Sequence, residues 1–164
     1  MKKYRGATLL ELSVAVFLLG LAVYGAGNLL AHAANASARQ VARAESFENV
    51  RVSLDFLVSQ AQAAHKITYT TRRNTGELNR MDLHASEAGG HVYIFVFDGL
   101  AGRLNFGGSS NYPFTAGTNE LASGLKEIKI FHDVENELLV FTATSGDGEY
   151  SLSAAADVRY KKIN

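Results

Sequence analysis

One carboxylate, Glu11, stands inside a long apolar stretch near the start of the chain. The stretch covers residues 7–38, and Glu11 is the only residue in it with a formal charge. A charged side chain in hydrocarbon costs at least about 2–3 kcal/mol, so such groups are usually paired with an opposite charge. The chemistry that this carboxylate can supply is the neutralisation of a positively charged amine inside an apolar helix bundle.

No other polar residues have the spacing of a catalytic or metal site. None of the five histidines is spaced from another as metal ligands are, for example in His-x-x-x-His. Ser13 has no histidine and aspartate close to it in sequence, and the chain has no cysteine to act as a nucleophile or metal ligand. The sequence therefore predicts no enzyme, no metal site and no cofactor. The histidines are His32, His65, His84, His91 and His132.

Three short polar motifs are interpreted as turns or solvated surface. Residues 147–149 lack the spaced oxygen ligands of a calcium loop, so a hairpin turn is predicted. Gly107 and Gly108 are not followed by the lysine and helix of a phosphate loop. A basic cluster at residues 72–73, with Lys66 and Arg80, is a conceivable DNA contact, but a solvated turn is favoured. The chain carries 16 basic and 16 acidic residues, so no basic excess indicates nucleic-acid binding.

The apolar stretch is long enough to cross a membrane as a helix. Crossing takes roughly 20 apolar residues, and the stretch is longer than the apolar core of about 7–15 residues in a secretory signal. Lys2, Lys3 and Arg5 precede it, and basic residues before a span favour the cytoplasmic side. The sequence therefore predicts a single-pass anchor in the cytoplasmic membrane, with the rest of the chain outside.

The helix is expected to continue beyond the apolar stretch to about residue 64. No proline occurs between Thr8 and Ala64, and beyond Arg39 apolar residues recur at helical spacing and form one face. Glu48–Arg51 and Arg51–Asp55 have the spacing of weak surface ion pairs. The residues of the apolar face are Phe47, Val50, Leu54, Leu57, Val58 and Ala61.

Three glycines interrupt the apolar stretch, at Gly20, Gly25 and Gly27. Glycine weakens a helix by roughly 0.5–1 kcal/mol relative to alanine, which would favour local melting. Small residues also allow close packing of helices in a membrane. Both interpretations remain open from the sequence.

After Ala64 the apolar residues alternate with period two, which predicts strands. Seven strands and a surface loop at residues 106–117 are expected, so the fold class is α+β: a long N-terminal helix whose C-terminal half packs on an antiparallel sheet domain. The predicted strands cover residues 65–70, 77–84, 91–98, 103–106, 127–132, 137–144 and 150–160.

Residues 6–12 (GATLLEL) resemble the processing site of type IV prepilins and pseudopilins. In that family a membrane peptidase cuts after the glycine, the new N-terminus is methylated, and the fifth residue after the cut is a glutamate. Glu11 is the fifth residue after Gly6. Ala7 stands where the family usually has phenylalanine.

The resemblance implies a role for each part of the chain. Residues 1–6 would be a leader peptide containing Lys2, Lys3 and Arg5, and the peptidase would cut between Gly6 and Ala7. Residues 7–38 would form the transmembrane and assembly helix, in which Glu11 pairs with a neighbouring N-terminus. Residues 39–164 would form the exported pilin-like domain. The partners implied are the prepilin peptidase, other pilin or pseudopilin subunits through their N-terminal helices, and the cytoplasmic membrane.

The spacing of strands in residues 120–164 is similar to that of minor pilins and minor pseudopilins, above all the larger minor subunit of type II secretion, competence and type IV pilus systems. The resemblance therefore implies a structural minor subunit, located in the membrane and, after assembly, in a pilus or pseudopilus. The alternative is a protein of another functional class: a membrane-anchored extracytoplasmic binding domain whose signal anchor is not cleaved.

Overall fold

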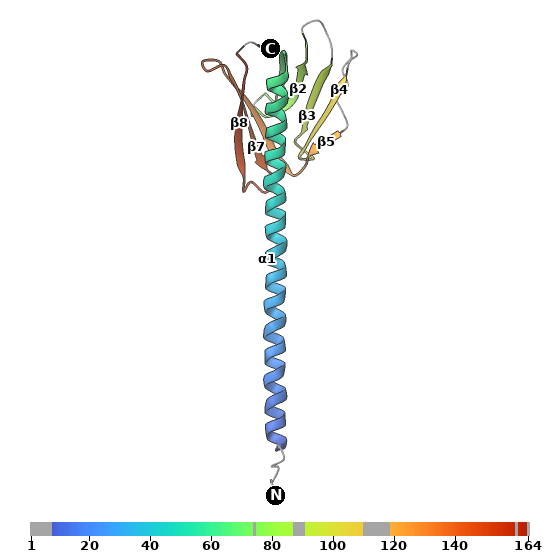
Figure 1. The fold of residues 1–164 in the computed structure, drawn as a ribbon, viewed down its shortest axis with the longest axis vertical. Coiled ribbons are helices and arrows are strands. Elements are labelled where there is room, and N and C mark those ends of the chain that lie inside the picture. Colours follow the sequence, from blue (N-terminus) through green and yellow to red (C-terminus); the bar gives the residue numbers. More distant parts are fainter. Residues whose placement is uncertain (1–7, 74, 87–90, 110–118, 160, 164) are drawn as a thin grey trace. The chain divides into compact units, whose positions relative to one another are not determined.

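The computed structural model describes residues 8–73, 75–86, 91–109, 119–159 and 161–163. Its first element, α1, is a single helix over Leu9–Ala63, as the absence of proline predicts. Within these described ranges nine strands follow, several of which are labelled in Figure 1. They are β1 (Lys66–Thr71), β2 (Leu78–His84), β3 (Val92–Asp98), β4 (Arg103–Ser109), β5 (Asn119–Ala122), β6 (Leu125–Asp133), β7 (Leu138–Ser145), β8 (Ser151–Asp157) and β9 (Lys162–Ile163).

The chain divides into two compact units. The N-terminal unit is Met1–Arg43 and the C-terminal unit is Ala44–Asn164, so α1 passes through both. The predicted class, a long apolar N-terminal helix followed by antiparallel sheets, is confirmed. The predicted division between residues 38 and 39 remains a prediction.

The strands of the C-terminal unit form two sheets, where the sequence predicted one. The larger has the order β5-β4-β3-β2-β1-β9, and the smaller has the order β6-β7-β8. All pairs are antiparallel except β1–β9, which is parallel and joins Lys66 and Ile67 to the C-terminal tail. A two-residue strand has too few residues to show an alternating pattern, which is why β9 was not predicted.

Strand β4 is longer than predicted because its glycines pair instead of turning. Gly107 lies opposite Ile94, and Gly108 lies opposite Tyr93. A Cβ at Gly108 would overlap the imidazole of His91, so the absence of a side chain lets the ring lie against the strand. Strand β5 was missed because its four residues have no clear alternation.

The core of the C-terminal unit is formed by one face of α1 together with both sheets. Val50, Leu54 and Leu57 of the helix belong to the same buried cluster as residues of β1–β8. Phe56 contacts the rings of Phe95 in β3 and Phe106 in β4, at centroid distances of 5.8 and 5.2 Å. The helical spacing of apolar residues beyond Arg39 therefore marks the face that is buried in this unit.

Of the two ion pairs predicted on the helix surface, one forms. The Arg51 guanidinium lies 3.6 Å from the Asp55 carboxylate, and both side chains are largely exposed. Among the described residues Glu48 makes no such pair with Arg51.

Candidate assembly site

Glu11 lies in the first turn of α1, where it forms a reciprocal capping box with Thr8. Thr8 N–H donates to Glu11 Oε2 at 2.9 Å, and Glu11 N–H donates to Thr8 Oγ1 at 3.3 Å. This is the Thr-x-x-Glu arrangement in which each side chain satisfies a backbone N–H that the helix leaves without a partner. The helix therefore begins at Leu9 because its two capping residues are three positions apart.

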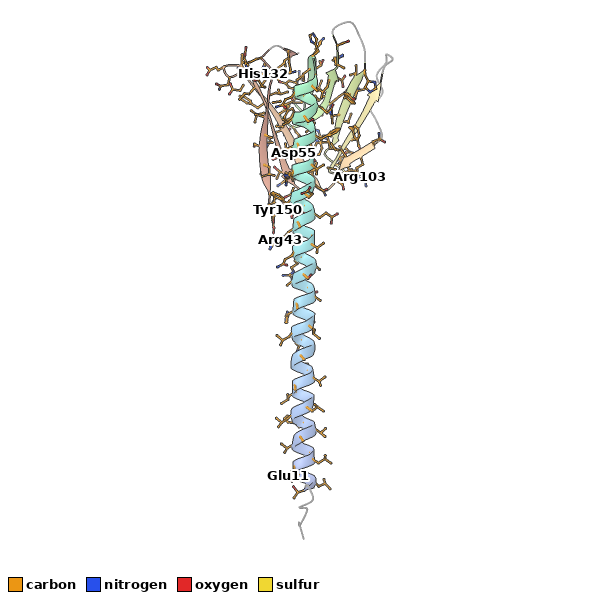
Figure 2. The ribbon with its side chains drawn as sticks, viewed as in Figure 1. Glu11, Arg43, Asp55, Arg103, His132 and Tyr150 are labelled. Atoms are coloured by element: carbon orange, nitrogen blue, oxygen red, sulfur yellow. The ribbon has the colours of Figure 1, made fainter. Side chains whose placement is uncertain are left out.

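The position of the carboxylate is also electrostatically favourable. The first turn of a helix carries a partial positive charge, which stabilises an acidic side chain by about 0.3–1 kcal/mol. Glu11 is the acidic residue of this first turn (Figure 2). The structure therefore shows two local reasons for a glutamate here, a cap and a helix dipole, that need no partner chain.

The rest of the N-terminal unit presents bulky apolar side chains without covering them. Every described residue from Thr8 to Arg43 is exposed. Helix α1 is long and apolar enough to cross a membrane, and such side chains need lipid or another apolar surface around them. Examples are Leu9, Leu12, Phe17, Leu21 and Leu30, each more than half exposed.

The predicted processing residues lie outside the part of the chain that the structure describes. These are Gly6 and Ala7, together with the leader residues Lys2, Lys3 and Arg5. Most of the predicted loop at residues 106–117 also lies outside it. The structure thus brings Glu11 and Thr8 together and leaves the cleavage site as a prediction.

The hairpin turn predicted at residues 147–149 lies between β7 and β8. Asp147 accepts hydrogen bonds from Ser145 Oγ and from Glu149 N–H at 3.0 Å, which closes the turn between β7 and β8. In the basic cluster, Arg72 pairs with Glu77 at 3.2 Å, and Arg80 pairs with Asp82 at 2.7 Å. Within the described ranges no group of three or more metal-ligating residues occurs.

An open hollow of about 440 Å³ lies at the C-terminal end of α1, lined by six residues, including Asp157, Arg159 and Lys161. Its charged groups are engaged within the chain. Arg159 donates to the Asp157 carboxylate and lowers the pKa of that group to about 2. Lys161 Nζ donates to the carbonyl of Gln62 at 2.8 Å and to that of Ala64. The hollow therefore offers no unpaired charge as a ligand site among its described side chains.

Comparison with protein-family models, with curated proteins and with solved structures finds no match to this chain. The role of Thr8 was missed from the sequence, although Thr-x-x-Glu before an apolar run is the signature of a capping box. The candidate site therefore rests on Glu11, its cap and the exposed apolar helix around them.

Proposed function

We propose that this chain is a structural minor subunit of the pilin or pseudopilin kind, processed after Gly6 and assembled through its N-terminal helix. The single observation that carries the proposal is Glu11, the one formal charge of residues 8–38, at the start of a helix that can cross a membrane. The sequence resemblance at residues 6–12 supplies the processing step.

The physical argument concerns what Glu11 pairs with. In the isolated chain its carboxylate accepts a hydrogen bond from the neutral Thr8 N–H. Cleavage after Gly6 would create a charged amine on Ala7, and an amine from a neighbouring chain is a stronger, charge-assisted donor. An unpaired carboxylate in the apolar interior is costly. A neighbouring chain whose amine lies beside Glu11 is therefore bound more favourably than one whose amine lies elsewhere along the helix.

The system that the subunit would serve belongs to one class of machine: a type IV pilus, a type II secretion pseudopilus or a competence pilus. In each, the subunit would be a substrate of the prepilin peptidase and would catalyse nothing itself. Its C-terminal unit would lie outside the cytoplasmic membrane.

The test combines processing with assembly in the host that produces the protein. The intact mass should match Ala7–Asn164 plus one methyl group. Glu11→Gln, which keeps the shape and removes the charge, should leave that mass shift unchanged but reduce incorporation into sheared filaments by at least about tenfold, the loss expected for a desolvated charge pair. Thr8→Ala is the matched control, because it removes the Thr8 hydroxyl that accepts from Glu11 N–H and keeps the carboxylate.

Two outcomes would contradict the proposal. A mass matching Met1–Asn164 with an active peptidase present would leave a membrane-anchored binding domain with an uncleaved anchor. Normal incorporation of Glu11→Gln would refute the charge-pair role.

A further inference from the structure

Strand β8 is an open edge of the smaller sheet. Among the described strands it pairs with β7 alone (Figure 1). The pairing covers all seven residues of β8 without a shift in register. A strand at the edge of a sheet presents a row of unpaired N–H and C=O groups, to which another strand can bind.

The other three edge strands in the described part of the chain are protected against such binding. Strand β9 has two residues, and β5 has four and pairs with β4 through a shift in register. Strand β6 carries Lys126 and Lys129, and Lys129 forms a bridge to Glu77. Short length, irregular pairing and lysines are the usual means of preventing strand addition. Strand β8, with the sequence SLSAAAD, has none of them.

Two hydrogen bonds that flank β8 show which of its backbone groups point outward. Ser145 N–H donates to the carbonyl of Tyr150, and Val158 N–H donates to the carbonyl of Glu137, each at 2.9 Å. In an antiparallel ladder, residues bonded to the facing strand alternate with residues that are not. The even-numbered residues of β8 therefore bond to β7, and the N–H and C=O groups of its odd-numbered residues point away from β7.

The outward-pointing residues are small and exposed. They include Ser151, Ser153 and Ala155, which repeat every two residues, or about 6.8 Å along the strand. The two serine hydroxyls contact the hydroxyls of β7, Ser153 with Thr142 at 2.7 Å and Ser151 with Thr144 at 3.3 Å. Among the described residues no group is hydrogen-bonded to the outward N–H and C=O groups of these three.

We propose that β8 binds an extended segment of a different extracytoplasmic polypeptide, which adds a fourth strand to the smaller sheet. Alternating donors and acceptors at this spacing match the backbone of another extended chain, and the small side chains allow it to approach. On the outer face Ala155 continues an apolar row with Val140 and Phe131, whereas Ser153 continues a polar row with Thr142. The segment therefore carries an apolar residue beside Ala155 and a polar residue beside Ser153.

The direction of β8 argues against a second copy of the chain as the partner. Tyr150, just before β8, contacts Phe47 with a ring-centroid distance of 5.6 Å, and Lys161, beyond β8, donates to the carbonyl of Gln62. Strand β8 thus runs in the same direction as the part of α1 in this unit. Antiparallel pairing of two β8 strands would place the points where the two chains enter, at residue 44, at opposite ends of the joined sheet.

The choice of a different polypeptide rests on the proposed function, because two copies anchored in one membrane both reach residue 44 from the membrane side. Parallel pairing of two β8 strands about a two-fold axis is also unfavourable. It places each residue beside its own counterpart, so each N–H lies beside an N–H instead of a C=O.

Hydrogen exchange of the full chain tests the open edge. In detergent, the amides of Ser153 and Ala155 should exchange at least about tenfold faster than those of Leu152 and Ala154, which bond to β7. In assemblies isolated from the producing host, Ser153 and Ala155 should slow to the rate of their neighbours. Slow exchange of both in detergent, or unchanged fast exchange in the assemblies, would overturn the docking edge.

Ser153→Pro tests the outward N–H itself. Proline removes this donor without breaking a bond to β7, because proline is tolerated on an edge strand where the N–H points away from the sheet. The protection of Ala155 in the assemblies should be lost at least several-fold. Ser153→Ala is the matched control, since it keeps the N–H and should keep the protection. Ala155→Lys, a lysine of the kind that β6 carries, should weaken docking even if the proline variant fails to fold.

The partner is identified by cross-linking in the producing host, with Ser151→p-benzoylphenylalanine in the full chain. A cross-linked peptide from another protein, lost when Ser153→Pro is added, would support the inference. A cross-link to β8 of a second copy would overturn the choice of partner.

Failure of this inference is distinguishable from failure of the proposed function. If Ser153 and Ala155 stay unprotected while processing and the dependence on Glu11 persist, the docking edge is wrong and the proposed function stands. If the protection forms but the chain is not processed, the proposed function is wrong and β8 is the binding edge of an anchored domain.

Discussion

Glu11 and Thr8 cap the start of helix α1 without any partner chain. The cap holds the carboxylate at the helix start, 2.9 Å from the Thr8 nitrogen, so its rotamer is restricted before any partner arrives. A group that is already oriented loses less side-chain entropy on binding. The capping box therefore favours the pairing that we propose and is not an alternative to it.

The lowered pKa of one residue, Asp157, predicts how the stability of the fold depends on pH. The side chain of Arg159, and then its backbone N–H at 3.0 Å, hold the pKa of Asp157 at about 2, below its ordinary value of 3.8. A carboxyl whose pKa is lower in the folded state stabilises the fold above its unfolded pKa, and this stabilisation is lost as pH falls from about 4 to about 2.

An NMR titration of the Asp157 carboxyl carbon checks this expectation. Arg159→Gln should return the pKa of Asp157 toward its ordinary value. Arg103→Gln is the control, because Arg103 pairs with Glu120 at 3.5 Å and has no role in the Asp157 pair. An unchanged pKa in Arg159→Gln would show that the guanidinium is not the cause.

At the scale of elements, helix α1 changes its role along its length. Its described residues up to Glu45 are exposed all round, whereas in the C-terminal unit Val50, Leu54, Leu57 and Ala61 are buried on one side. A helix that is apolar all round needs lipid or other helices, and one with a single apolar stripe needs one packed surface.

The buried stripe makes Leu57→Ala a strong test of how the helix contributes to the C-terminal unit. Leu57 has no exposed surface, and truncating such a leucine costs about 2–5 kcal/mol in the free energy of unfolding. Val52→Ala is the control, since Val52 lies in the same helix and is 38% exposed, and it should cost less than about 1 kcal/mol.

Denaturant unfolding of the full chain in detergent, followed by tyrosine fluorescence, measures both variants. Equal losses in the free energy of unfolding for Leu57→Ala and Val52→Ala would mean that the face of α1 containing Leu57 is not part of the cooperatively unfolding core.

At the scale of the whole molecule, the core belongs to one unit only. Every residue of the buried cluster lies between Val50 and Val158, within the unit Ala44–Asn164. The N-terminal unit adds no described residue to that cluster. The stability of the C-terminal unit therefore does not depend on the apolar stretch.

A fragment of residues 44–164 should consequently fold by itself and stay soluble. Its stability in urea should be within about 1 kcal/mol of that of the same unit in the full chain, because no core contact is removed. Dispersed amide signals in a nitrogen–proton NMR spectrum would support this. Binding of a hydrophobic dye with loss of dispersion would contradict it.

Particular residues show how far prediction from the sequence could go. The absence of proline predicted a continuous helix, and the run of residues 91–98, which is apolar on both faces, predicted the central strand β3. The two glycines at 107–108 were assigned to a loop, because their place in β4 depends on Tyr93 and Ile94 across the ladder. The parallel pairing of β9 with β1 could not be predicted from the sequence either, because it joins Lys162 to Lys66, which are far apart along the chain.

The sequence by itself determined the local features: the long apolar helix with Glu11 at its start, the amphipathic stripe beyond Arg39 and most of the strands. These follow from hydrophobic periodicity and capping, which act over a few neighbouring residues. Only the tertiary structure decided that the strands divide into two sheets and that Lys161 donates to the carbonyls of Gln62 and Ala64 at the end of α1. Those features depend on contacts between residues that are far apart in the sequence. The spacing of residues along the chain does not predict which of their polar groups form hydrogen bonds.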